Sequence, residues 1–222
     1  MPSEPTPDTP RLIDGSDAAA ATLLLAHGAG APMDSPFMAA IAAGLAGRGW
    51  RVVRFEFPYM ARMRATGRRH GPDRLPVLQE ALRQQLGQER RDAPARPLVL
   101  GGKSMGGRIA SLVVDGMAAE ADVRGCLCFG YPFHPPGRPL QLRTAHLESL
   151  RTPTLVLQGE RDSFGRRGEL EAIPLSPRIQ LEWIPDGDHS FKPTRRSGLL
   201  EADNWARAVG LADDFLRGLF QA

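Results

Sequence analysis

Residues 98–107 read LVLGGKSMGG and lead directly into the apolar segment RIASLVV at residues 108–114. The continuously apolar start of this stretch is typical of a strand that is covered on both faces. Gly102 and Gly106 flank Ser104 in the pattern G-x-S-x-G, and small residues are needed where a strand turns sharply into a helix. The stretch therefore predicts a nucleophile elbow, in which the Ser104 hydroxyl stands above the carboxyl ends of the strands.

Two stretches of the chain resemble known phosphate-binding loops in part. The spacing of their glycines excludes both kinds of loop. The sequence GKS at residues 102–104 also ends a P-loop, but that loop needs a glycine where this chain has Pro97. A dinucleotide-binding loop at residues 27–31, HGAGA, needs a third glycine where the chain has Met33. Neither glycine-rich stretch therefore predicts a nucleotide site.

Short apolar runs alternate with longer amphipathic segments along most of the chain. Each run ends in Gly, Pro or a polar turn, which is the pattern of βαβ units. This alternation predicts a doubly wound α/β fold with a buried, mainly parallel sheet. The expected strands are 22–27, 51–57, 98–103, 125–131, 154–158 and 180–184, and the expected helices are 36–48, 75–90, 105–119 and 199–219.

Length and composition indicate one folded domain. The 222 residues carry a formal net charge of +3 and a hydrophobic fraction of 42%, which excludes global disorder. Prolines crowd the first ten residues, so we expect residues 1–20 to form a loose arm and residues 21–222 a single domain. No apolar run is long enough for a membrane helix, and the small net charge gives no basis for a nucleic-acid partner.

The two cysteines, Cys126 and Cys128, lie within one expected strand. Residues two apart in a strand point to the same face, and this is a poor geometry for a disulfide. The cysteine usage therefore predicts a reducing compartment, the cytoplasm.

A base and an acid are expected downstream of Ser104, in the chain order serine, acid, histidine. His189 follows the last expected strand and is the candidate base. Asp162 follows the strand before it and is the candidate acid, because a carboxylate in that place holds the imidazole in the productive tautomer. Glu160 is the rival acid, whereas Asp188 is adjacent to His189 in sequence and would reach its far ring nitrogen poorly.

Backbone N–H groups should stabilise the oxyanion of such a site. One donor is expected from Met105, the residue after the nucleophile, and the other from the loop after the first expected strand, with Ala29 as the candidate. Loss of one such donor typically costs about 2.7 to 4 kcal/mol of transition-state stabilisation. The glycine-rich segment 27–31 is therefore expected to take part in the chemistry.

Basic residues crowd the segment 61–74. A solvated loop that leads into a helix is the favoured interpretation, and a patch for an anionic ligand or partner is the alternative. The residues concerned are Arg62, Arg64, Arg68, Arg69, His70 and Arg74.

Five stretches together resemble the α/β-hydrolase superfamily, and within it the small lidless hydrolases related to dienelactone hydrolase. That group includes bacterial proteins of undefined substrate and the hydrolase-like domains of testis-expressed and histone-acetyltransferase-complex subunits. The stretches are HGAG at 27–30, FEFPYM at 55–60, GGKSMGGR at 101–108, YPFHPP at 131–136 and DHSF at 188–191.

The resemblance runs from about residue 20 to the C-terminus and implies that Ser104, Asp162 and His189 serve as nucleophile, acid and base. Dienelactone hydrolases proper use a cysteine nucleophile, so the resemblance does not imply their lactone substrate. The superfamily sheet has eight strands, but the first 21 residues leave little room for two of them. We therefore expect a lidless α/β-hydrolase fold with six or seven strands.

The expected activity is hydrolysis of a small carboxylic ester or thioester through an acyl-Ser104 intermediate, without a metal or a cofactor. The alternative is a hydrolase-fold interaction module with a vestigial triad, and the sequence does not predict the oligomeric state. Because relatives insert a lid between the positions of Phe133 and Pro153, the short segment here predicts an open cleft. Its candidate walls are Tyr59, Met60, Phe133, His134 and Phe164.

Overall fold

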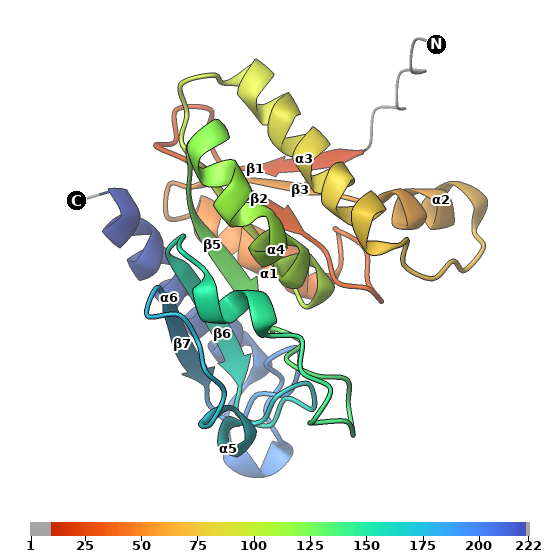
Figure 1. The fold of residues 1–222 in the computed structure, drawn as a ribbon, viewed down its shortest axis with the longest axis vertical. Coiled ribbons are helices and arrows are strands. Elements are labelled where there is room, and N and C mark those ends of the chain that lie inside the picture. The colour runs from red at the N-terminus through yellow and green to blue at the C-terminus, as the bar shows by residue number, and fades with distance from the viewer. Residues whose placement is uncertain (1–9, 221–222) are drawn as a thin grey trace.

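The computed structural model describes residues 10–220, which build a seven-stranded sheet with helices on both faces (Figure 1). The strand order is β1-β3-β2-β4-β5-β6-β7; β1 is antiparallel to β3, and all other neighbours are parallel. The expected doubly wound, mainly parallel sheet of six or seven strands is thus confirmed. The strands are β1 (Arg11–Asp14), β2 (Thr22–Ala26), β3 (Arg51–Phe55), β4 (Leu98–Lys103), β5 (Val123–Phe129), β6 (Thr154–Gly159) and β7 (Ile179–Ile184).

The parallel registers bring the carboxyl ends of the strands to one edge of the sheet. Ala26 at the end of β2 lies beside Gly102, and Lys103 at the end of β4 lies beside Phe129. Every residue of β2, β4 and β6 is buried, as their apolar sequences predict. The loops that leave β2, β4, β6 and β7 therefore meet above this edge.

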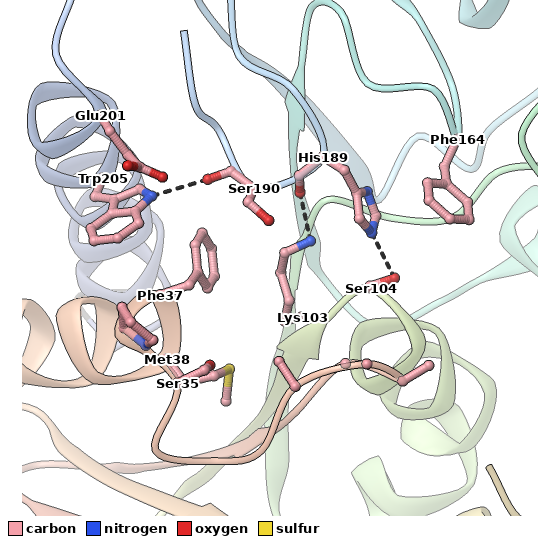
Figure 2. Close-up of a pocket in the computed structure, with 15 residues that line it drawn as sticks. Ser35, Phe37, Met38, Lys103, Ser104, Phe164, His189, Ser190, Glu201 and Trp205 are labelled. Carbon is pink, nitrogen blue, oxygen red and sulfur yellow. Dashed lines mark hydrogen bonds between the residues drawn. The ribbon is translucent and has the colours of Figure 1, made fainter. Parts of the chain in front are cut away.

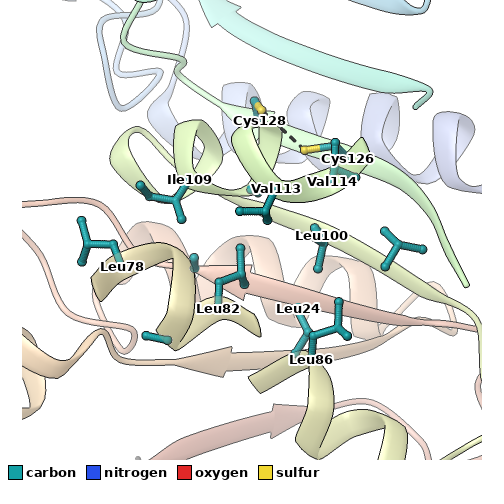
Figure 3. Packing of buried hydrophobic residues seen from close by; sticks show 14 of the residues in the cluster. Leu24, Leu78, Leu82, Leu86, Leu100, Ile109, Val113, Val114, Cys126 and Cys128 are labelled. Carbon is teal, nitrogen blue, oxygen red and sulfur yellow. Dashed lines mark hydrogen bonds between the residues drawn. The ribbon is translucent and has the colours of Figure 1, made fainter. Parts of the chain in front are cut away.

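Two hydrophobic layers hold the helices against the sheet. The helices α3 (Leu75–Asp92) and α4 (Met105–Glu120) cover one face, where Leu82 and Val113 pack in the same buried cluster as Leu24 of β2 (Figure 3). The helices α1 (Pro36–Ala46) and α6 (Glu201–Phe220) cover the other face. The two buried clusters thus place the sheet between helices on both of its faces.

The expected loose arm over residues 1–20 is wrong for its second half, because Arg11–Asp14 forms the edge strand β1. Side chains reinforce the pairing with β3, since Arg54 forms an ion pair with Asp14 at 2.9 Å. Arg11 forms an ion pair with the buried Glu89 of α3. Residues 1–9 lie outside the described residues, and the sheet begins before residue 21, where the single domain was expected to start.

The basic segment is only partly the loop that was predicted. Its first residues belong to the helix α2 (Pro58–Thr66), which begins shortly after β3 ends at Phe55. Arg64 of α2 pairs with the buried Glu56 and with Asp34, while Arg62 pairs with Asp73. These two arginines are therefore held by carboxylates of the chain.

The connection between β5 and β6 holds only loops and the 3₁₀ turn η1 (Ala145–Ser149), so no lid domain is inserted there. Two other short helical pieces, α5 (Arg167–Leu170) and η2 (Arg195–Ser197), lie in the connections beyond β6 and β7. Cys126 and Cys128 are free and buried, with sulfur atoms 3.9 Å apart. Among the residues that the structure describes, no helix combines the length and the apolar character that a membrane crossing needs.

Candidate active site

The strand β4 passes into α4 through a sharp turn at Ser104. The backbone of Ser104 has φ 52° and ψ −114°, an unfavourable conformation for a residue with a side chain. Its neighbours must be small, because a Cβ on Gly106 would lie 2.4 Å from the carbonyl oxygen of Ala26. A Cβ on Gly102 would lie 2.4 Å from the backbone of Gly106. The Gly-x-Ser-x-Gly pattern thus forms the strained strand-to-helix turn that the sequence predicts.

His189 lies in the loop after β7, with its imidazole facing Ser104. The Ser104 hydroxyl is 2.8 Å from Nε2 of His189, the geometry in which a hydroxyl donates to a neutral imidazole. Burial lowers the pKa of His189, and this effect outweighs the Asp162 hydrogen bond, which raises it; the positive charge of Lys103 lowers the pKa further. The imidazole is therefore held in the neutral form, which can accept a proton.

Asp162 is fully buried beneath the imidazole. Its Oδ2 accepts from Nδ1 of His189 at 2.8 Å and from the side-chain amide of Gln158 at 2.9 Å. Its Oδ1 accepts from the backbone N–H of Phe164 at 2.9 Å. The carboxylate is thus fixed by three donors, and it fixes the His189 ring with the unprotonated nitrogen towards Ser104.

The two rival carboxylates point elsewhere. Glu160 pairs with Arg167 at 2.8 Å and accepts from the backbone N–H of Asp186 at 3.0 Å. Asp188 accepts from the backbone N–H groups of Ser190 and Lys192 and so caps the turn that carries the histidine. The structure thus brings Ser104, Asp162 and His189 together and leaves Glu160 and Asp188 out of contact with the imidazole.

The loop after β2 lies next to Ser104, and its peptide groups are held from below. The Tyr59 hydroxyl donates to the carbonyl oxygen of Ala29 at 3.0 Å and lies 3.3 Å from that of Gly28. His27 bonds the Gly28 carbonyl through Nδ1 at 2.6 Å and accepts from the backbone N–H of Phe57 through Nε2 at 3.0 Å. These contacts fix the loop that carries the predicted oxyanion donor Ala29. The other predicted donor, Met105, is the first residue of α4.

A cavity of about 570 Å³ opens beside Ser104, between the loop after β2 and the helices α1 and α6 (Figure 2). Phe37, Met38 and Trp205 give it apolar walls, and Lys103 and His189 add polar groups. The remaining lining residues are Gly28, Ala29, Gly30, Ala31, Ser35, Pro36, Ser104, Phe164, Ser190 and Glu201.

Only Phe164 of the five predicted walls lines this cavity, and its ring stacks at 4.3 Å from the His189 ring. Tyr59, Met60 and Phe133 are buried in the hydrophobic layer under α3 and α4. His134 is also buried, and it bonds the Glu169 carboxylate at 3.2 Å. The prediction that these four residues line the cleft is wrong for this cavity, because their side chains pack into the core instead.

Lys103, Phe37 and Trp205 line the cavity but were not singled out from the sequence. Phe37 and Trp205 belong to α1 and α6, whose approach to Ser104 depends on how the layers pack. Lys103 carried a signal, because it precedes Ser104 at the end of β4. Side chains alternate along a strand, so Lys103 must point to the face that α1 and α6 cover.

Residues 19–217 match the family described as the alpha/beta hydrolase domain. The match spans most of the chain and includes all three residues of the Ser104–His189–Asp162 hydrogen-bonded set. It therefore covers the whole candidate site.

Solved structures give the same fold. A serine hydrolase without a lid, XC6422 from Xanthomonas campestris, superposes with a TM-score of 0.64 at 22% identity, covering 89% of this chain and 85% of that one. Dienelactone hydrolase from Anabaena variabilis gives 0.69 at 21% identity, covering 94% and 90%. Est1E from Butyrivibrio proteoclasticus, solved with ferulic acid bound, gives 0.72 at 14% identity, covering 96% of each chain.

Proposed function

We propose, from the premise that this chain belongs to the alpha/beta hydrolase family, that it is a serine hydrolase which cleaves a carboxylic ester or thioester. Ser104 is the nucleophile, His189 the general base and Asp162 the residue that orients the base. The observation that carries the proposal is the pair of 2.8 Å hydrogen bonds, one from Ser104 to His189 and one from His189 to Asp162.

In the first half-reaction, Nε2 of His189 takes the Ser104 proton while Oγ attacks the carbonyl carbon of the substrate. The carbonyl electron pair moves to oxygen, and the backbone N–H groups of Ala29 and Met105 stabilise that oxyanion. When the carbonyl re-forms, the bond to the leaving alcohol or thiol breaks, and His189 donates its proton to the leaving group.

In the second half-reaction, His189 takes a proton from water, which attacks the acyl-Ser104 carbonyl. The tetrahedral intermediate collapses, the acid leaves, and the proton returns to Ser104. Asp162 stays ionised throughout and stabilises the imidazolium that forms in each half. Besides the substrate and one water molecule, the proposed cycle uses only side chains and backbone groups of this chain.

The cavity has the size and the character to bind a small acyl or alcohol group of the substrate. Its volume of about 570 Å³ lies in the range typical of small-molecule sites, and its walls are mainly apolar. The free, buried cysteines support the cytoplasm as the proposed location.

A fluorophosphonate probe tests the proposal, because it forms a stable adduct only with an activated serine. We expect one adduct per chain, located at Ser104 by peptide mass spectrometry, and none in Ser104→Ala. The Ser111→Ala variant is a matched control, since Ser111 also contacts a histidine, at 2.9 Å from Nε2 of His146, but lies in the middle of α4. It should be labelled like the wild type.

Absence of an adduct on the folded wild type, or equal labelling of Ser104→Ala, would contradict the hydrolase proposal. The first of these outcomes would favour the alternative of an interaction module with a vestigial triad.

A further inference from the structure

Lys103 is a buried cation next to the nucleophile. It is the last residue of β4, it is 7% exposed, and it lines the cavity. Its ammonium donates to the backbone carbonyl oxygen of His189 at 2.6 Å and lies 5.5 Å from the centre of the Phe37 ring (Figure 2). In the described part of the chain, 10–220, no carboxylate forms an ion pair with it.

A charge in this place is costly, because burial removes its hydration and no counter-ion pairs with it directly. The neighbouring residues on the same face are apolar, and Phe129 and Phe37 belong to the layer between the sheet and α1. A residue such as leucine would fill the position at lower cost. The ammonium must therefore be explained by what it contacts, and its contact is the backbone of the candidate base.

Three side-chain donors hold the loop that carries His189, each by one of three consecutive backbone carbonyl groups. Lys103 bonds that of His189, Trp205 donates to that of Ser190 at 3.0 Å, and Asn204 donates to that of Phe191 at 2.8 Å. Trp205 and Asn204 are neutral and come from α6, whereas Lys103 comes from the strand that ends at Ser104. Of these three donors, Lys103 is thus the one that connects the nucleophile strand to the main chain of the histidine.

We infer that Lys103 is a positioning residue for His189. The ammonium of Lys103 fixes the backbone of the histidine and places a positive charge beside the imidazole. The catalytic part of this inference rests on the proposed function. Because Ser104 follows Lys103 immediately, the same strand end fixes both the nucleophile and the main chain of its base. The Lys103 contact thereby opposes any change in the distance between β4 and the loop after β7, and the Ser104–His189 hydrogen bond depends on this distance.

Several charged groups face the imidazole, and the charge of Lys103 opposes the carboxylates. Asp162 from the loop after β6 and Asp188 from the histidine loop raise the pKa of His189, whereas Lys103 from β4 lowers it, in the same direction as burial. Burial also lowers the pKa of Lys103, to about 8, although Asp162 and Asp188 raise it. Lys103 is therefore still charged at the lower pH at which His189 titrates.

Two variants separate the charge of Lys103 from its hydrogen bond. Lys103→Met removes both and keeps an unbranched apolar side chain that suits the contact with Phe37. Lys103→Gln removes the charge and keeps an N–H donor for the His189 carbonyl. The pKa of His189 is measured directly by NMR titration of the ¹⁵N-labelled histidine side chains, with the His189 signals assigned by their loss in His189→Gln.

We expect the pKa of His189 to move to higher pH in both variants, since a nearby positive charge that disfavours the imidazolium has been removed. We also expect kcat for a short aryl ester to fall about tenfold to a hundredfold in Lys103→Met, the rate equivalent of losing one hydrogen bond to a charged group. Lys103→Gln should lose less. Trp205→Phe is the matched control, because it frees the next carbonyl without a change in charge and should leave the pKa of His189 in place.

An unchanged pKa of His189 in both Lys103 variants, or an equal shift in Trp205→Phe, would overturn the inference. Thermal unfolding of each variant establishes that it is folded before titration. If Lys103→Met does not fold, Lys103→Gln still tests the inference, because it keeps a polar side chain at the site. The titration needs no substrate. If the wild type neither hydrolyses esters nor reacts with the fluorophosphonate, the proposed function fails while the effect of Lys103 on His189 is still measured.

Discussion

Asp162 and His189 come from two different loops, after β6 and after β7, and meet at 2.8 Å between Oδ2 and Nδ1. Glu160, only two residues before Asp162, directs its carboxylate to Arg167 and to the backbone of Asp186. A choice between two neighbouring carboxylates that the sequence leaves open is thus decided by the turn at residues 159–165, in which Asp162 faces inward.

Asp162→Asn should lower kcat by about a thousandfold to ten-thousandfold, because an amide stabilises the wrong tautomer of His189 and does not compensate the imidazolium. Glu160→Gln is the matched control, since it makes the same change of charge two residues away and should cost far less. Steady-state kinetics with a short aryl ester measures both variants. Similar losses in the two would indicate a general electrostatic effect and contradict the assignment of Asp162.

The acid limb of kcat/KM should lie below pH 6.5, the ordinary pKa of histidine. Burial disfavours the charged imidazolium and lowers the pKa of His189, so the neutral base persists as the pH falls and is lost only below the lowered pKa. A pH-stat assay on a neutral ester measures the limb without interference from the leaving group. An acid limb above pH 6.5 would show that His189 is stabilised as the imidazolium.

Tyr59→Phe should lower kcat about fivefold to tenfold with little change in KM, although Tyr59 does not line the cavity. Its hydroxyl holds the carbonyl groups of Gly28 and Ala29, so its loss loosens the loop that carries the predicted oxyanion donor. Tyr131→Phe is the control, since that buried hydroxyl bonds the Arg143 carbonyl at 2.9 Å instead. Equal kcat losses in both variants would refute a role through the loop.

Gly106→Ala should destabilise the fold by about 2 to 3 kcal/mol, because the new Cβ would lie 2.4 Å from the Ala26 carbonyl oxygen and 2.7 Å from that of His27. Gly116→Ala is a control in the same helix, where an added Cβ meets no atom within 4 Å. It should stabilise the protein by about 0.5 to 1 kcal/mol through helix propensity. Urea unfolding measures both, and a neutral Gly106→Ala would contradict the close packing of the elbow.

The central strands could be predicted because burial on both faces requires continuously apolar sequences, as in Leu98-Val99-Leu100. The edge strand β1 could not, because Arg11–Asp14 is short, half exposed and paired with β3, which follows much later in the chain. Its ion pairs with Arg54 and Glu89 depend on that pairing and leave no local pattern.

The candidate site was predictable where a residue's role follows from its place after a strand. Ser104, Asp162 and His189 each stand in the first turns after a parallel strand, and the registers bring those turns to one edge. The cavity walls depend instead on how far α1 and α6 reach over that edge. An aromatic residue near a strand end, such as Phe133, is therefore equally compatible with a core position, and the structure places it there.

The anchoring of the histidine loop by α6 has a consequence for the biosynthesis of the protein. Trp205 and Asn204 lie in α6, which leaves the ribosome after every strand of the sheet has been made. Until that helix docks against α1, the carbonyl groups of Ser190 and Phe191 lack these two donors. Two of the three donors that hold the carbonyl groups of the histidine loop are therefore made last, and Lys103 is the one donor of the three that is already present when this loop is synthesised.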